Sequence, residues 1–328
     1  MMRRASAAPK AAARPALRAT AVQRRALSVV AAHSAKELND KFAIAGSVAV
    51  VEGKSGSTMV TLKHSCGSSA EIYLHGACVT SWKQASGDEV LYVRPDAVFD
   101  KSKPISGGVP HCFPQFGPGA MQQHGFARNL DWDIASTSAD VNADEKDPVV
   151  EFVLTENEYT LKMFPYKFKA VYNVRLHGEQ LCTELKVHNT DDKPFEFTAA
   201  LHTYIEVLGI ELAKVKGLKG LTYLDKSKDA KNPETKTEAA DAITFSEYMD
   251  RVYLNTPGHV ELDVGTGAAV AIDSSGWTDN VVWNPWTTME ACYKNFVCVE
   301  NAASGKPQVV APGGVWSATA SFNVQDSK

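Results

Sequence analysis

The sequence predicts an all-β protein that forms one large antiparallel β-sandwich. From about residue 45 onward, short runs rich in Val, Tyr, Phe and Thr alternate with Gly, Asp, Asn and Ser, which is the pattern of strands joined by turns. Strands do not alternate with helices, and no repeat of roughly 20–50 residues occurs, so Rossmann folds, TIM barrels, propellers and solenoids are disfavoured. The 328-residue chain shows no later break in composition, which favours a single large sandwich.

The predicted strands are short, rich in β-branched and aromatic residues, and bounded by turn-forming residues. In chain order they are residues 47–51, 59–63, 70–74, 149–154, 169–176, 181–188, 195–207, 252–254, 268–273, 295–300 and 316–324. Helix signals are few; residues 35–42 give the strongest, and residues 247–250 have the composition of a turn. Residues 225–238 are rich in Lys, Asp and Thr, so we expect a solvated loop there.

The first 35 residues differ in charge from the rest of the chain. They are rich in Ala and contain no Asp or Glu, and their seven basic residues are Arg3, Arg4, Lys10, Arg14, Arg18, Arg24 and Arg25. This composition resembles a chloroplast or mitochondrial transit peptide. A basic arm for nucleic acid is the alternative, but the segment has no aromatic residue to stack on bases. We expect a chloroplast transit peptide at residues 1–35, with the mitochondrion as the other possible destination, and a single domain at residues 36–328.

The remaining chain is acidic. Setting aside those seven residues leaves 27 of the 34 Lys and Arg residues against 38 Asp and Glu, a formal charge of about −11. An acidic body is a poor binder of polyanions, so we expect no nucleic-acid partner. No run of about 18 apolar residues occurs, so we expect no membrane-spanning helix. We expect the protein to be a monomer.

Several familiar catalytic and metal-binding motifs are absent. The six cysteines form no C-x-x-C pair, which argues against a zinc knuckle or a dithiol redox site and favours reduced thiols. The nine histidines form no H-x-H or H-x-x-x-H pair, and no G-x-S-x-G elbow occurs. Gly53-Lys54-Ser55 resembles the end of a phosphate loop, but Val48 occupies the position of its first glycine. The sequence therefore disfavours nucleotide, serine-hydrolase and metal chemistry.

Residues 103–130 stand apart from the strand pattern. Four prolines and five glycines fix an irregular backbone, and the polar side chains are His111, Gln115, Gln122, Gln123, His124 and Arg128. A loop of about this length inside a compact domain is usually functional. The alternative is a structural crossover whose polar groups cap turns, and the residues alone leave both possibilities open.

Three ordered groups of motifs match one family. They are Gly-Gly-Val-Pro, Phe-Pro-Gln-Phe-Gly and Gln-His-Gly-Phe-Ala-Arg-Asn at 107–110, 113–117 and 123–129, then Ala-Leu-His-Thr-Tyr at 200–204, then Val-Val-Trp-Asn-Pro-Trp and Asn-Phe-Val-Cys-Val-Glu at 281–286 and 295–300. They resemble the motifs of the aldose-1-epimerase-like hexose-6-phosphate mutarotases, which include the glucose-6-phosphate 1-epimerases and the plant apospory-associated protein C group. The resemblance covers about residues 45 to 325 and implies a galactose-mutarotase-like antiparallel β-supersandwich.

The resemblance also implies a function. A glucose-6-phosphate 1-epimerase is an isomerase of carbohydrate metabolism that interconverts the α and β anomers of a hexose 6-phosphate by acid–base ring opening and reclosure. Such a reaction needs a proton donor and a proton acceptor, and neither a cofactor nor a metal. A non-catalytic carbohydrate-binding or regulatory protein on the same fold is the alternative from a different class, because fold does not decide function. An epimerase for unphosphorylated aldoses is a third possibility, against which Arg128 argues.

His202 and Glu300 are the candidate catalytic residues. Strand alternation turns His202 away from the apolar face of residues 195–207, toward a polar surface or cleft. Glu300 shares its face with Phe296 and Cys298, and burial against them would raise the pKa of its carboxyl and strengthen it as a base. A solvated histidine and an exposed glutamate are the alternatives. In the resembling family the matching histidine protonates the ring oxygen, and the matching glutamate is the general base.

Four further residues match family positions that hold the sugar or its phosphate, namely Gln123, His124, Arg128 and Asp250. Asp250 can instead pair with Arg251 or cap a turn. Trp283 and Trp286 can stack on the apolar face of a sugar, or they can pack in the core.

Ser106 departs from the family pattern. Relatives usually carry Arg directly before the Gly-Gly-Ile/Val-Pro run, where it contacts phosphate, whereas this chain has Ser. A serine hydroxyl donates one neutral hydrogen bond and brings no charge. The resemblance therefore implies a weakened phosphate contact at Ser106, for which Lys101 or Lys103 of the same loop would compensate.

Overall fold

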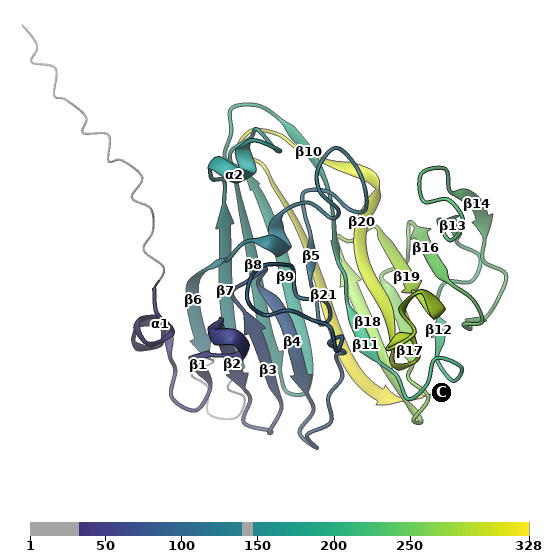
Figure 1. Cartoon of the computed structure of the whole chain (residues 1–328), viewed down its shortest axis with the longest axis horizontal. Coiled ribbons are helices and arrows are strands. Elements are labelled where there is room, and N and C mark those ends of the chain that lie inside the picture. Colours follow the sequence, from purple (N-terminus) through teal and green to yellow (C-terminus); the bar gives the residue numbers. More distant parts are fainter. Residues whose placement is uncertain (1–32, 140–146, 328) are drawn as a thin grey trace, which may run out of the picture. The chain divides into compact units, whose positions relative to one another are not determined.

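The strands form antiparallel sheets, which confirms the predicted all-β fold (Figure 1). The computed structural model describes residues 33–139 and 147–327, so the transit peptide predicted at residues 1–35 lies almost wholly outside the described residues. Within the described ranges there are three sheets, of four, eight and nine strands. No helix in this part of the chain is both long and apolar enough to cross a membrane. The six cysteines are free.

The described chain consists mainly of strands and contains very little helix. The helices are α1 (Ala35–Phe42) and α2 (Glu158–Leu161), with short 3-10 turns at Lys54–Gly56, Ala127–Asn129, Trp286–Met289 and Tyr293–Asn295. The strands are β1 (Val48–Glu52), β2 (Thr58–Lys63), β3 (Ser69–Tyr73), β4 (Cys78–Lys83), β5 (His111–Cys112), β6 (Asp133–Ala139), β7 (Pro148–Thr155), β8 (Phe168–His177), β9 (Gln180–Asn189), β10 (Phe195–Leu201), β11 (Tyr204–Glu206), β12 (Lys214–Lys216), β13 (Thr222–Asp225), β14 (Glu234–Thr237), β15 (Ala242–Ile243), β16 (Met249–Leu254), β17 (His259–Asp263), β18 (Ala268–Ser275), β19 (Asp279–Asn284), β20 (Phe296–Val310) and β21 (Val315–Asp326).

The predicted helix at residues 35–42 is α1, and each predicted strand overlaps an observed one, but three details were wrong. Residues 225–238 are not simply a solvated loop, because β13 and β14 pair across them as a hairpin. Residues 247–250 do not form a complete turn, since β16 has already begun at Met249. The strand predicted at residues 195–207 divides into β10 and β11, because the Thr203 N–H turns back to the Leu201 carbonyl (2.9 Å) instead of pairing with a neighbouring strand.

The eight-stranded sheet has one face in the core and one outer face. Val297 and Val299 of β20 belong to the same buried cluster as Phe168 of β8, so the core fills the space between the eight- and nine-stranded sheets. Because side chains alternate along a strand, the intervening residues of β20 point to the outer face. The same alternation in β10, β16 and β19 brings the outer-face residues together, namely His202, Asp250, Trp283 and Glu300.

Gly107 and Gly108 let the chain pass between two neighbouring segments. The Gly108 N–H donates to the Tyr92 carbonyl (2.8 Å), and the Val109 N–H donates to the Val79 carbonyl (2.9 Å). Both glycines have positive φ, and a Cβ on Gly108 would collide with the Val79 carbonyl oxygen. Glycine alone adopts this conformation at no steric cost. The Gly-Gly pair therefore fixes residues 106–110 against β4 and residues 92–94.

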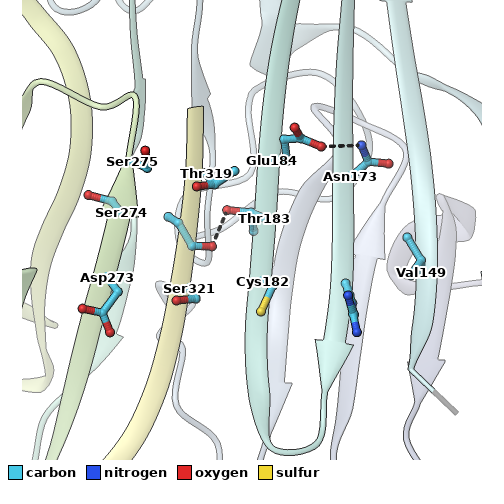
Figure 2. Close-up of a pocket in the computed structure, with 12 residues that line it drawn as sticks. Val149, Asn173, Cys182, Thr183, Glu184, Asp273, Ser274, Ser275, Thr319 and Ser321 are labelled. Carbon is cyan, nitrogen blue, oxygen red and sulfur yellow. Dashed lines mark hydrogen bonds between the residues drawn. The ribbon is translucent and has the colours of Figure 1, made fainter. Parts of the chain in front are cut away.

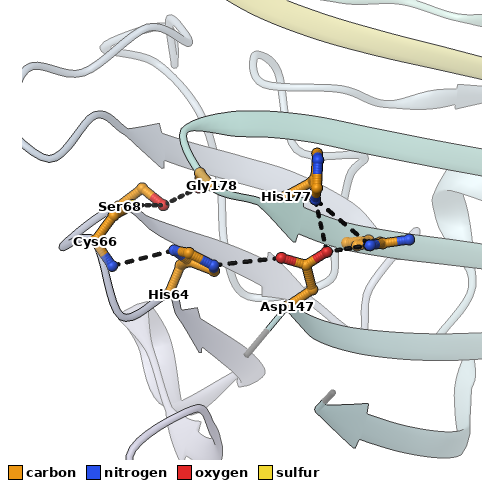
Figure 3. Close-up of polar contacts among 7 residues, drawn as sticks. His64, Cys66, Ser68, Asp147, His177 and Gly178 are labelled. Atoms are coloured by element: carbon orange, nitrogen blue, oxygen red, sulfur yellow. Dashed lines mark hydrogen bonds and ion pairs between the residues drawn. The ribbon is translucent and has the colours of Figure 1, made fainter. Parts of the chain in front are cut away.

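A buried polar cluster holds the start of β7 (Figure 3). The carboxylate of Asp147 accepts hydrogen bonds from Arg175 Nε (2.8 Å) and pairs with His177 Nδ1 (2.7 Å), and it lies 3.3 Å from His64 Nε2. Burial opposes ionisation of this carboxyl, but the hydrogen bonds from Arg175 and His177 outweigh it and lower the pKa of Asp147. The Arg175 guanidinium faces this carboxylate directly, so the pair ties β8 to the start of β7.

Candidate active site

His202 and Glu300 face one another on the outer face of the eight-stranded sheet. His202 Nδ1 lies 3.3 Å from Glu300 Oε1, and the two residues are only 8% and 1% exposed. His202 occupies the break between β10 and β11. Strand β20 spans that break, because it pairs with Leu201 of β10 at Asn301 and with Tyr204 of β11 at Cys298. The position of Glu300 along β20 therefore brings its carboxylate beside the imidazole.

Burial favours the uncharged form of each partner. It lowers the pKa of His202 to about 3, with a contribution from Arg128. It raises the pKa of Glu300 well above its usual value, and the nearby Asp250 adds to that rise while Lys226 and Arg128 oppose it. Two titratable groups this close, whose pKa values burial moves in opposite directions, act as one acid–base pair. It can therefore give a proton to one substrate atom and take a proton from another.

Aromatic rings surround the imidazole of His202. The Tyr204 ring stacks on it with centroids 4.9 Å apart, and Trp283 meets it edge-on at 5.4 Å. Trp286 lies instead against Tyr293, with centroids 5.1 Å apart, and packs against the main core. Trp283 is thus the tryptophan placed to offer a sugar its apolar surface.

His124 also contacts the His202 ring, with centroids 5.5 Å apart. Its Nδ1 accepts the Gly117 N–H (3.1 Å), and its Nε2 meets the Gln123 side-chain amide (3.2 Å). Because Nδ1 is an acceptor, the proton of the neutral ring is on Nε2, and this proton requires the Gln123 amide to present its oxygen there instead of its nitrogen. Burial, followed by the charges of His202 and Arg128, lowers the pKa of His124 to about 2. His124 is therefore a neutral hydrogen-bonding group at pH 7.

Arg128 brings a positive charge to the same cluster. Its Nη2 donates to the Gln123 carbonyl (2.9 Å), while its buried Nε has no hydrogen-bond partner among the described residues. Its charge acts on both His202 and Glu300. An unsatisfied guanidinium N–H beside a buried acid–base pair is suited to an anionic or hydroxyl-bearing ligand.

Asp250 lies in β16 opposite Trp283 of β19. The alternative of an ion pair with Arg251 is wrong, because Arg251 Nη1 lies 3.3 Å from Glu238 Oε2 instead. The turn-cap alternative is wrong as well, because the residue is inside a strand. Burial raises the pKa of Asp250, and Lys226 partly opposes this. The carboxylate is thus placed on the outer face, where it can accept hydrogen bonds from hydroxyl groups.

Lys226 is a residue that sequence reasoning missed. It follows β13, in the segment predicted as a solvated loop, and its Nζ lies 5.1 Å from the centroid of the Phe116 ring. Its charge acts on Glu300, Asp250 and His124. The pairing of β13 with β16 brings Lys226 to the site, and no local motif marks it.

Lys101 and Lys103 are the two lysines of this loop that we expected to compensate for Ser106. Lys101 Nζ is engaged with Asp131 at 2.5 Å, and the two side chains are both about half exposed. Lys103 is exposed, and its carbonyl oxygen contacts His75 Nε2 (3.2 Å). Ser106 itself is half-buried next to Gly107.

A hollow of about 700 Å³ lies on the nine-stranded sheet (Figure 2). It is lined by β7, β8, β9, β18 and β21, chiefly by small polar side chains such as Ser274, Thr319 and Ser321. None of the candidate site residues is in its lining. The acid–base pair is therefore not associated with this hollow.

Residues 58–323 match the aldose 1-epimerase family. The chain belongs to this family. It is an epimerase, an enzyme of the isomerase class. A protein of Cenchrus ciliaris named "Putative glucose-6-phosphate 1-epimerase" is 39% identical over 282 residues, which are 81% of this chain and 84% of that protein. An Escherichia coli protein of the same name is 36% identical over 74% of this chain and 82% of its own length.

Solved structures agree with the family assignment. The crystal structure of a "putative mutarotase" from Salmonella typhimurium has a TM-score of 0.77 and 28% identity, and the match covers 87% of this epimerase and 96% of that chain. A galactose mutarotase-like protein from Clostridium acetobutylicum has a TM-score of 0.70 at 17% identity, covering 85% of this chain and 98% of that one. The second likeness shows the fold alone, and it confirms the galactose-mutarotase-like architecture.

Proposed function

We propose that this epimerase interconverts the α and β anomers of a hexose 6-phosphate, with glucose 6-phosphate as the first candidate. The 3.3 Å approach of His202 Nδ1 to Glu300 Oε1 in a buried site supports the chemistry. The names of two relatives support the phosphorylated substrate. The direct test is anomer exchange measured by NMR, with glucose 6-phosphate and glucose compared side by side.

The pair carries one proton through the reaction. In the reactive form the proton that the pair shares is on His202, and Glu300 is ionised. His202 gives that proton to the ring oxygen while Glu300 takes one from the hydroxyl on C1, so the C1–O5 bond breaks, an open-chain aldehyde forms and the pair is left uncharged. Rotation about the C1–C2 bond presents the other face of the aldehyde. Closure reverses both transfers and returns the pair to its starting state. Each positioned group contributes about 10²–10⁴-fold to such a reaction, and Asp250, Gln123 and His124 are placed to hold the sugar.

An epimerase for unphosphorylated aldoses is the second candidate. The observation that favours it is Ser106, a neutral residue at the position where the family resemblance implies an Arg. The NMR comparison separates the two candidates, because such an enzyme exchanges the anomers of glucose at least as fast as those of glucose 6-phosphate.

We predict that Arg128→Ala lowers the kcat/KM for glucose 6-phosphate much more than the kcat/KM for glucose. A charge-assisted Arg–phosphate contact is about twice as strong as a neutral hydrogen bond, and the Nε of Arg128 has no partner within the described residues. The measurement is the ratio of the two kcat/KM values. An unchanged ratio would place the phosphate on another cation.

We further propose that the epimerase acts in the chloroplast, because the acid-free, Arg- and Ala-rich segment at residues 1–35 is typical of a transit peptide. We predict that the mature protein begins within about ten residues of Ala32. The check is N-terminal sequencing of the protein from its source. A chain that still begins at Met1 or Met2 would contradict the transit peptide.

A further inference from the structure

We propose that Arg94 supplies the phosphate-binding guanidinium that the family resemblance implies at position 106. The inference rests on the proposed hexose-6-phosphate function and names the residue that recognises the phosphate. It starts from the departure at Ser106, where the chain carries a neutral hydroxyl.

Arg94 and Ser106 lie directly opposite one another in a short antiparallel pairing. The Arg94 N–H donates to the Ser106 carbonyl (3.0 Å), Val93 bridges Gly107, and the Gly108 N–H donates to the Tyr92 carbonyl (2.8 Å). Opposed residues in such a ladder project to the same face, with Cβ atoms about 4.5–5.5 Å apart. The guanidinium of Arg94 therefore extends from the same face as residue 106, next to the place that an arginine side chain at residue 106 would occupy.

That face looks toward the acid–base pair. Tyr92 is two residues before Arg94 and so shares its face; its ring stacks on Phe296 with centroids 5.2 Å apart, and its N–H donates to the Tyr204 carbonyl (3.0 Å). Tyr204 in turn stacks on His202. The charge of Arg94 acts on both Tyr204 and His202.

The position of the phosphate within the substrate favours phosphate binding on the His202 side of the site. The phosphate is carried on C6, which is attached to C5 beside the ring oxygen, so it extends from the ring-oxygen side. His202 is the group that gives a proton to the ring oxygen. The charge of Arg94 acts on His202, whereas that of Lys226 acts on Glu300, Asp250 and His124. Arg94 is therefore the better placed of the two additional cations.

Asp96 limits how strongly Arg94 binds an anion. Its carboxylate accepts from Arg94 Nε (2.9 Å) and Nη2 (2.6 Å), which uses two of the five guanidinium N–H groups. The other N–H groups remain for a ligand, and the Arg94 side chain is still 17% exposed. Asp96 is the more exposed partner, so neutralising it releases the guanidinium without burying a new group.

The test is calorimetric binding of glucose 6-phosphate and of glucose to wild type and to five variants, one of which is Lys226→Gln. Arg94→Gln should raise the Kd for glucose 6-phosphate by about tenfold or more, since hydrogen bonds to charged groups are the strong ones, and should change the Kd for glucose much less. Asp96→Asn should tighten glucose 6-phosphate. The double exchange Arg94→Ser with Ser106→Arg should restore binding to within about threefold of wild type. Lys101→Gln, which removes a charge already paired with Asp131, is the matched control.

The outcomes separate two failures. If wild type prefers glucose 6-phosphate and exchanges its anomers, but Arg94→Gln leaves the preference unchanged or weakens both sugars equally, the assignment of Arg94 is overturned and the proposed function stands. Loss of the preference in Lys226→Gln but not in Arg94→Gln also overturns it. If wild type shows no preference for the phosphorylated sugar, both proposals fail.

Discussion

Glu300→Gln lowers the rate of anomer exchange by at least about 10²-fold and leaves the fold intact, because it removes the base that accepts the anomeric proton. Gln is nearly isosteric with Glu, so the fully buried site keeps its packing. Burial already favours the uncharged form of this carboxyl and raises its pKa. The neutral amide therefore causes little or no loss of stability. The measurements are the exchange rate by NMR and the Tm of each protein.

Glu196→Gln is a suitable control. Glu196 lies on β10 but is exposed, so the same chemical change there should alter neither the exchange rate nor the Tm. Full exchange activity in Glu300→Gln would refute the assigned role. A large fall in Tm would show that the carboxylate is needed for folding rather than for proton transfer.

His202→Ala is expected to lower the exchange rate by at least about 10²-fold, because the ring oxygen then lacks a proton donor.

The pH dependence of kcat/KM in the wild-type enzyme is a second, independent test of the acid–base pair. Burial lowers the pKa of His202 to about 3 and raises that of Glu300. The state with one shared proton thus persists below the usual histidine pKa of about 6.5 and above the usual carboxyl range. We expect kcat/KM to stay high as the pH falls through 6 and to decline at alkaline pH, when the pair loses its proton.

Glucose is the better substrate for this profile, because the second ionisation of a phosphate monoester falls near pH 6. His259→Asn is the control for His202→Ala, since His259 is an exposed histidine that pairs with Asp273 at 2.7 Å. A profile that collapses near pH 6.5, as for a solvated imidazole, would contradict the shared-proton pair.

Strand alternation predicted the orientation of His202 and the burial of Glu300, because a period of two survives wherever one face of a strand is packed. The structure shows both residues on the outer face of the eight-stranded sheet, with Glu300 1% exposed. The family resemblance supplied the candidate roles, which the strand pattern alone does not contain. The irregular backbone of residues 103–130 could likewise be predicted, since its glycines and prolines act locally.

Pairing between distant segments could not be predicted. Lys226 reaches the site only because β13 pairs with β16, and a Lys-, Asp- and Thr-rich segment gives no sign of that hairpin. Arg94 lies opposite Ser106 only because residues 92–94 pair with residues 106–108. Both depend on long-range hydrogen bonds, which leave no periodic signal in a single sequence. The break after His202 was missed as well, because the Thr203 N–H donates to the Leu201 carbonyl inside a run whose composition is that of one continuous strand.

The acid–base pair lies on strands of the eight-stranded sheet, whereas the cations lie on other segments, and this separation has a consequence for protein engineering. His202 and Glu300 are held by β10, β11 and β20, whereas Arg94, Arg128 and Lys226 come from separate loops or hairpins outside those strands. Loops tolerate substitution better than the strands they join. Exchanging the cationic loops should therefore retarget the enzyme to sugars with a sulfate, a carboxylate or no acidic substituent. The strands that hold the acid–base pair stay the same, but the pKa values of His202 and Glu300 shift with the cations that act on them.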